Sequence, residues 1–130
     1  MELNKDIETR DKIIYGKYRP KKYEHGGTAH FEDMTVKTLG RLLRDKFADP
    51  EDAQNLAPTI QEFYDFLKIH SGYTVHGYTV SENRDDYRVS IEGLYKPIPA
   101  STPGEYQDFI NFNKYADELQ VQNYMYSWFD

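Results

Sequence analysis

The chain has 130 residues, carries a net charge of −6 and contains no cysteine, which excludes a disulfide scaffold, a thiolate zinc site and a cysteine nucleophile. This length is typical of one domain, and 12 Tyr and 7 Phe argue against a disordered chain. No apolar run approaches the ~18 residues of a membrane helix, and residues 1–10 are too charged for a signal peptide. We therefore expect a cytoplasmic protein without membrane contact.

Charge is distributed unevenly along the chain. Residues 1–46 carry 11 basic and 8 acidic side chains, whereas residues 47–130 carry 5 basic and 14 acidic ones. Such asymmetry bears on partners and solubility more than on fold. We predict one domain over residues 1–130, with residues 1–32 as an irregular basic segment packed on it.

The sequence of residues 1–32 predicts few helices or strands. Pro20 and Gly26-Gly27 divide it into short extended pieces, and the strand candidates are 13–15 and 28–31. A helix is predicted from about residue 33 or 35 to residue 47, because Val36, Leu39, Leu43 and Phe47 form one apolar stripe. Gly40 inside this helix indicates close packing against a neighbour.

Two further helical pieces are predicted next. Asp49-Pro50 is typical of a helix start, and Pro58 interrupts the pattern. The longer helix that follows places Ile60, Phe63, Tyr64 and Leu67 on one face and ends at Gly72.

The hydrophobic period then changes to that of strands. Residues 73–80 and 87–95 predict an antiparallel hairpin joined by the polar loop 81–86. Thr102 and Glu105 have the form of a capping box before another helix, and one last strand is predicted over 119–129. This strand should bury Leu119, Val121 and Met125 against the helices.

The predicted fold class is α+β, with a mainly antiparallel sheet and helices packed on one face. The first guess for its order is ferredoxin-like, β-α-β-β-α-β with an extra helix.

Catalytic and metal-binding motifs are absent from the sequence. The four histidines, His25, His30, His70 and His76, match no ligand spacing; the first two are interpreted as loop residues. There is no G-x-S-x-G elbow and no phosphate loop. We expect no metal site, no cofactor and no catalytic residues, although a small ligand-binding domain or enzyme is a second alternative.

The interleaving of cations and aromatic rings in residues 17–23 indicates a different function. Cations neutralise phosphates while aromatic rings stack on bases, so direct binding of single-stranded nucleic acid is the first alternative. Its residues are Lys17, Tyr18, Arg19, Lys21, Lys22 and Tyr23. The sequence pI of about 5.2 argues against a dedicated nucleic-acid domain.

The leading hypothesis uses the sheet face that carries no helices. Period-2 alternation places polar and aromatic side chains there, and at least two of Tyr124, Tyr126 and Trp128 should be among them. The competing interpretation is that these rings are ordinary core, since a slip of one residue exchanges the faces. The predicted partner-binding residues are Tyr78, Arg88, Glu92, Tyr124, Tyr126 and Trp128.

These observations predict a non-catalytic acidic interaction module. Its expected partner is a protein with a basic, nucleic-acid-binding surface, because Asp and Glu can stand in for phosphate charge. The protein would then be an inhibitor or regulator of the kind that mobile elements encode. A second copy of the chain, as a homodimer, is a further candidate partner.

Overall fold

A computed structural model describes residues 1–18, 23 and 26–130. The elements follow in the order α1 (Ile7–Tyr15), the 3-10 turn η1 (Gly16–Tyr18), β1 (Thr28–Met34), α2 (Val36–Arg44), α3 (Ile60–Ile69), β2 (Thr74–Val80), β3 (Val89–Lys96), α4 (Pro103–Phe112), β4 (Glu118–Val121) and β5 (Met125–Trp128). None of the helices within these ranges is long and apolar enough to cross a membrane.

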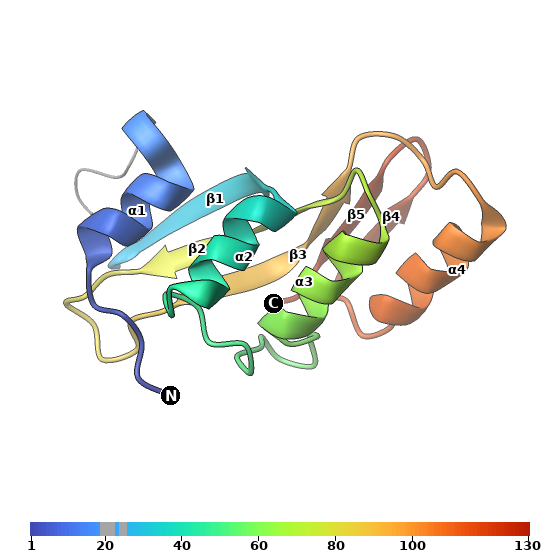
Figure 1. Ribbon diagram of the computed structural model, residues 1–130. Helices are drawn as coiled ribbons and strands as arrows, with labels where there is room; N and C mark the ends of the chain where they lie inside the picture. The colour runs from blue at the N-terminus through green and yellow to red at the C-terminus, as the bar shows by residue number, and fades with distance from the viewer. Residues whose placement is uncertain (19–22, 24–25) are drawn as a thin grey trace.

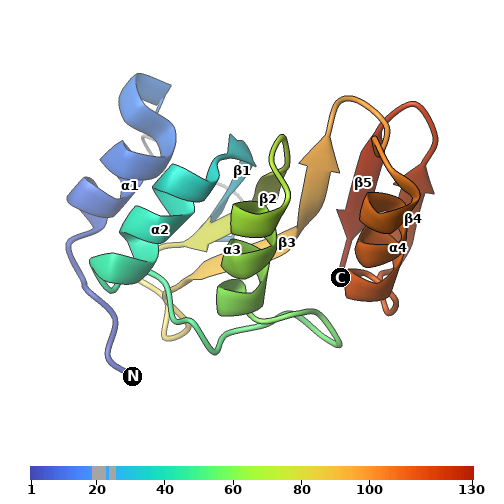
Figure 2. The same ribbon diagram turned by 45° about the vertical axis from the view of Figure 1, so that its right-hand side comes forward.

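The five strands in the described part of the chain form one sheet in the order β1-β2-β3-β5-β4, and each neighbouring pair is antiparallel. This order departs from chain order only where the β4–β5 hairpin folds back (Figure 1). The helices lie together on one side of the sheet (Figure 2). The α+β class, the antiparallel sheet and the helices on one face are confirmed. From β1 to β4 the elements follow the expected β-α-β-β-α-β succession with one extra helix, since both α2 and α3 lie between β1 and β2; α1 and β5 come in addition.

Helix α2 forms where the apolar stripe predicts it. Thr35 caps it, since its hydroxyl accepts a hydrogen bond from the backbone N–H of Thr38. Leu39 and Leu42 are fully buried, so the stripe is centred one residue away from the expected set, which lacked Leu42. A Cβ on Gly40 would lie 3.0 Å from the ring of Tyr64 on α3, which confirms the predicted close packing.

Residues 49–57 form turns, so the short helix predicted at Asp49 is wrong. Asp49 does accept a hydrogen bond from the N–H of Glu51, as a capping residue would. However, the backbone carbonyls of Pro50 and Asp52 accept the first N–H groups of α3. These carbonyls therefore pair with the N-terminus of α3 and do not form the hydrogen bonds of a helix that starts at Asp49.

The N-terminal segment is more regular than its sequence indicated. Residues 13–15, expected as a strand, end the helix α1, which Asp6 caps by accepting from the N–H of Thr9. Residues 28–31 do begin a strand. The prediction that residues 1–32 are irregular is therefore wrong for their described part, although α1 does pack on the core through Ile13 and Ile14.

The single strand predicted over residues 119–129 is a hairpin of two short strands. Val121 faces Met125 across it, and Leu119 faces Ser127. Residues that face each other across a tight hairpin lie on the same face of the sheet. The period-2 assignment of side chains to the two sheet faces is therefore correct, although one strand was predicted where the structure has two. Met125 is buried in the core, whereas Leu119 and Val121 are partly buried against it.

Thr102 caps α4 as expected, since its hydroxyl accepts from the N–H of Glu105. The Glu105 carboxylate does not complete the capping box, which would require it to accept a hydrogen bond from the backbone N–H of Thr102. It accepts hydrogen bonds instead from Lys96 Nζ and Tyr73 Oη, both at 2.8 Å, and from Ser101. The acid therefore joins α4 to the sheet.

Candidate functional site

A pocket of about 420 Å³ opens on the sheet face opposite the helices, called here the open face. On β1 and β5, lining residues alternate with core residues such as Phe31 and Met125, which places the pocket on the far side of the sheet from the core. This acid–aromatic pocket is lined by His30, Glu32, Asp33, His76, Glu92, Tyr95, Tyr126 and Trp128.

His76 lines the pocket, and its partner across the β2–β3 pair is Gly93. A Cβ on Gly93 would lie 2.8 Å from Nε2 of His76 and 1.9 Å from the carbonyl oxygen of Ser127. Because glycine leaves this space open, the His76 ring passes over β3 and reaches β5. There Nε2 lies 2.8 Å from the Ser127 carbonyl, and the ring stacks on Tyr126 with a centroid distance of 5.2 Å and an interplanar angle of 6°.

The hydrogen bond sets the protonation of His76. A carbonyl oxygen only accepts, so Nε2 carries the proton. Burial lowers the pKa of His76, against the opposing effects of the Ser127 hydrogen bond and Glu92. The ring is therefore neutral near pH 7.

Two shifts of strand register lie beside the acidic residues that line the pocket. The register of β1 against β2 shifts between Phe31 and Met34, where Asp33 has a φ of 56°, and Glu32 and Asp33 both line the pocket there. The register of β2 against β3 shifts between His76 and Gly77, which leaves Glu92 as the extra residue on β3.

The Glu92 carboxylate accepts a side-chain hydrogen bond through one of its two oxygens. Its side chain is 16% exposed. Oε2 accepts a hydrogen bond from Nε1 of Trp128 at 3.2 Å, while Oε1 lies 4.0 Å from Nδ1 of His30. The second distance is too long for a hydrogen bond. His30 Nε2 lies 3.5 Å from Oε1 of Glu32.

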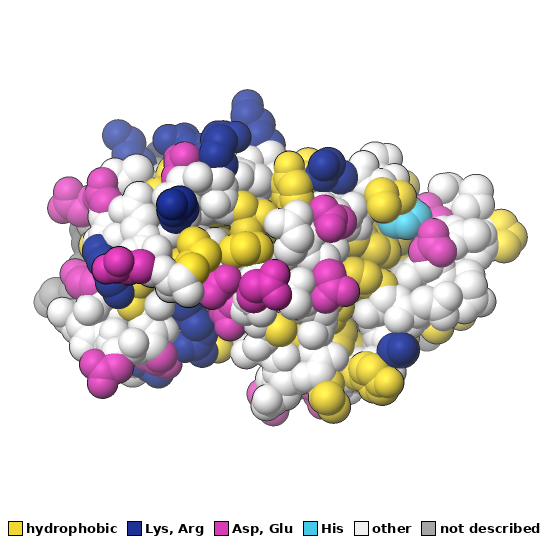
Figure 3. Space-filling model, turned by 60° about the horizontal axis from the view of Figure 1, so that its bottom comes forward, with side chains coloured by type: hydrophobic (Ala, Val, Ile, Leu, Met, Phe, Trp, Pro, Cys, Tyr) yellow, Lys and Arg dark blue, Asp and Glu magenta, His cyan; other side chains and the backbone are white. Residues whose placement is uncertain are grey.

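The electrostatic character of the pocket is acidic. Three carboxylates and no lysine or arginine stand among those of its lining residues that the structure describes. Burial raises the pKa of Tyr126, and the negative charges of Glu118, Glu92 and Glu32 raise it further. Figure 3, which views another side of the molecule, shows acidic side chains across that surface and Lys and Arg gathered at the end that carries α1 and α2.

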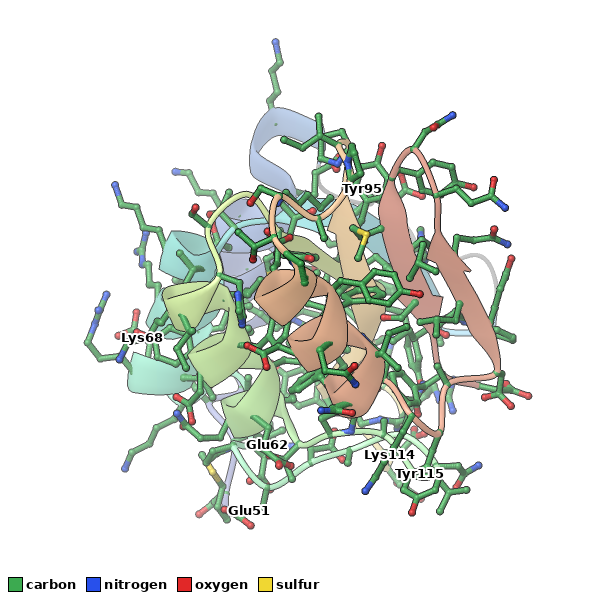
Figure 4. The ribbon with its side chains drawn as sticks, turned by 90° about the vertical axis from the view of Figure 1, so that its right-hand side faces the viewer. Glu51, Glu62, Lys68, Tyr95, Lys114 and Tyr115 are labelled. Carbon is green, nitrogen blue, oxygen red and sulfur yellow. The ribbon has the colours of Figure 1, made fainter. Side chains whose placement is uncertain are left out.

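Three of the six predicted partner-binding residues, Glu92, Tyr126 and Trp128, line the pocket together. Tyr126 and Trp128 are half-buried and lie outside the core cluster, so the competing interpretation as core is wrong. Tyr124 lies in the β4–β5 turn, 40% exposed, near Tyr95, which Figure 4 labels at the end of β3.

Tyr78 and Arg88 form a separate cluster. Arg88 Nη2 donates to the Tyr78 hydroxyl at 2.7 Å, and Arg88 Nη1 binds the carboxylate of Asp86 at 2.8 Å. Gln54 also reaches the Tyr78 hydroxyl, at 3.3 Å. Neither Tyr78 nor Arg88 lines the pocket.

Sequence reasoning missed His30, Glu32, Asp33 and Tyr95. His30 was interpreted as a loop residue although the strand candidate 28–31 contains it, and it lies in β1 opposite Tyr78. The alternation of His30 with Phe31 was the available signal, but the acids that follow depend on a bulge that no periodicity indicates.

The residues of the nucleic-acid alternative are only partly described. Arg19, Lys21, Lys22 and the side chain of Tyr18 lie outside the described part, and Lys17 is exposed in η1. The Tyr23 hydroxyl accepts from Arg10 Nη2 at 2.8 Å and donates to the Asp11 carboxylate. Burial and the Asp11 hydrogen bond raise its pKa to about 12. This hydroxyl is thus anchored in the protein body.

Arg10 and Asp11 form a buried ion pair beneath that tyrosine. Their side chains are 0% and 1% exposed, and Arg10 Nη1 also donates to the carbonyl of Val80 at 3.0 Å. The pair ties α1 and residue 23 to β2, which gives it a structural role.

No group of three His, Asp or Glu side chains within residues 1–18, 23 and 26–130 is arranged to hold a metal ion. His70 is the C-cap of α3, and its Nε2 lies 3.3 Å from Oδ2 of Asp108 on α4. His25 lies outside the described residues.

Comparison of the chain with protein-family models, with curated proteins and with solved structures gives no significant match. The function is therefore argued from the geometry and charge of the acid–aromatic pocket.

Proposed function

We propose that the protein is a non-catalytic interaction module that binds a basic surface of a partner protein through its open face. The composition of the acid–aromatic pocket carries this proposal, since three carboxylates stand beside three aromatic rings without a lysine or arginine among the described lining residues. Carboxylates attract cationic groups and steer encounter, while rigid rings supply contact area at low entropic cost.

The proposed partner surface is one that otherwise binds nucleic acid. Residues 47–130 have a net charge of −9, and an array of carboxylates can occupy a channel built for phosphates. A protein that fills such a channel competes with the nucleic acid. The proposed role is therefore that of an inhibitor or regulator of a nucleic-acid-handling protein, of the kind that mobile elements encode.

Affinity capture followed by reconstitution tests this role. The tagged protein is incubated with native host lysate at low salt, and each captured protein is then purified and titrated against the wild type, Glu92→Lys and the control Glu51→Lys. Glu51 is exposed and lies far from Tyr95 (Figure 4). We expect a basic partner whose association weakens with salt, is lost with Glu92→Lys, persists with Glu51→Lys and blocks nucleic-acid binding.

Several results would overturn the proposal. One is capture of no basic protein, and another is an association that Glu92→Lys leaves intact while the variant keeps its circular dichroism spectrum. Self-association of the purified chain through the open face, measured by sedimentation, would replace the partner by a second copy.

Direct binding of nucleic acid is the alternative, and anisotropy with labelled single-stranded DNA and RNA separates it from the leading proposal. Direct binding predicts a signal that falls steeply with salt. The net charge of −9 over residues 47–130 and the internal hydrogen bonds of the Tyr23 hydroxyl argue against it.

The second alternative, a small ligand-binding domain or enzyme, draws support from the pocket itself. Its volume of about 420 Å³ lies within the range of small-molecule sites. However, no serine, threonine or lysine stands among its described lining residues, so a nucleophile would have to come from the carboxylates, histidines or tyrosines.

A further inference from the structure

Two rings in the acid–aromatic pocket are stacked on each other, which leaves the outer face of the stack for a further planar group. His76 and Tyr126 are stacked within 6° of parallel. The neutral state of His76 near pH 7 also keeps a positive charge away from that surface. Planar cations pack on such ring faces, and arginine does so more readily than lysine because its charge is delocalised over a plane.

A carboxylate with a free acceptor position stands beside these rings. Trp128 fixes one oxygen of Glu92 through its indole N–H, and no described donor lies within hydrogen-bond distance of the other oxygen. A carboxylate held in this way loses little further conformational freedom when a ligand binds. It can accept a hydrogen bond from a guanidinium, with Glu32 and Asp33 adding negative charge at the rim.

The pocket has the size of a side-chain site. Its volume of about 420 Å³ lies near the lower end of the range for ligand pockets, and side chains of β1, β2, β3 and β5 line it. It therefore suits one inserted side chain better than an extended peptide.

We propose that the acid–aromatic pocket receives a single arginine side chain of the partner protein, with the guanidinium against the aromatic rings and hydrogen-bonded to Glu92. This inference rests on the proposed function, because it names the group by which the basic partner is recognised. The other acids of the open face then surround the arginine as a negatively charged rim.

The chain contains one tryptophan, Trp128, so its fluorescence and its single indole N–H resonance both report on the pocket. N-acetyl-arginine amide serves as the probe for an arginine within a chain, and N-acetyl-citrulline amide is its neutral isostere. N-acetyl-lysine amide tests the preference for a planar cation, and free L-arginine tests for an amino-acid ligand.

We expect a saturable shift of the Trp128 signals with N-acetyl-arginine amide, weaker binding of the lysine probe and no shift with the citrulline probe. Glu92→Gln keeps the size of the side chain and should weaken the arginine probe about tenfold, the loss typical of one hydrogen bond between charged groups. Glu51→Gln, which removes the same charge elsewhere, should leave the affinity unchanged.

Equal binding of the arginine and citrulline probes, or unchanged affinity in a folded Glu92→Gln variant, would refute the arginine site. Tighter binding of free L-arginine than of the amide would reassign the pocket to a free amino acid. These results are distinct from failure of the proposed function, since a partner can still bind the open face without inserting an arginine. Conversely, a working arginine site with no basic partner would refute the function alone.

Discussion

Replacement of Glu105 by glutamine should reveal how strongly α4 is tied to the sheet. The Glu105 carboxylate accepts from Lys96 Nζ and from the Tyr73 hydroxyl, and the Glu105 and Lys96 side chains are 11% and 7% exposed. Glutamine leaves the Lys96 ammonium without its counter-charge. Breaking a fully buried pair costs about 3–5 kcal/mol; because this pair retains some contact with water, we expect the free energy of unfolding to fall by about 2–3 kcal/mol.

The same pair predicts a pH dependence. Burial alone raises the pKa of Glu105, but the hydrogen bonds from Lys96, Ser101 and Tyr73 outweigh it and lower the pKa to about 2. A carboxyl whose pKa is lowered on folding stabilises the native state fully above its ordinary pKa of 4.5. The stabilisation is lost as the pH falls from there towards 2.

Urea denaturation of wild type and Glu105→Gln between pH 7 and pH 2.5 measures both effects. The difference in unfolding free energy should be constant near neutrality and shrink below about pH 4.5. Glu51→Gln is the matched control for loss of an exposed charge, and Lys96→Met combined with Glu105→Gln should recover part of the loss. A difference below about 1 kcal/mol at pH 7, or one that does not change with pH, would refute this reasoning.

Three further predictions test other parts of the fold. Gly93→Ala places a methyl group 1.9 Å from the Ser127 carbonyl and should lower the unfolding free energy by about 2–4 kcal/mol, whereas Gly104→Ala, whose Cβ meets nothing closer than 3.9 Å, should be nearly neutral in urea denaturation. Asp11→Asn leaves the Arg10 guanidinium buried without its counter-charge, so thermal unfolding should show a loss of about 3 kcal/mol; an unchanged melting temperature would contradict the buried pair. Because burial lowers the pKa of His76, the unfolding free energy should fall as the pH drops below its ordinary value of 6.5, and an NMR titration that places this pKa at or above 6.5 would contradict the geometry.

Local patterns in the sequence were sufficient for several elements. The apolar stripe from Val36 to Phe47 predicts α2, and the β-branched runs on either side of loop 81–86 predict the β2–β3 hairpin. These signals work because a 3.6 or 2.0 residue period depends only on nearby residues. For the same reason, period-2 alternation placed Tyr126 and Trp128 on the open face even though the single strand proved to be a hairpin.

The acid–aromatic pocket, in contrast, depended on tertiary structure. Glu92 and Glu32 sit at irregularities of register that arise from hydrogen bonds to another strand, and a one-residue bulge changes which side chains share a face. His76 reaches Tyr126 only because Gly93, on a strand between them, has no side chain. The sequence by itself thus determined α2, α3, α4, the β2–β3 hairpin, the acidic charge and the aromatic residues near the C-terminus, whereas strand register and the open space above Gly93 decided which of these residues meet.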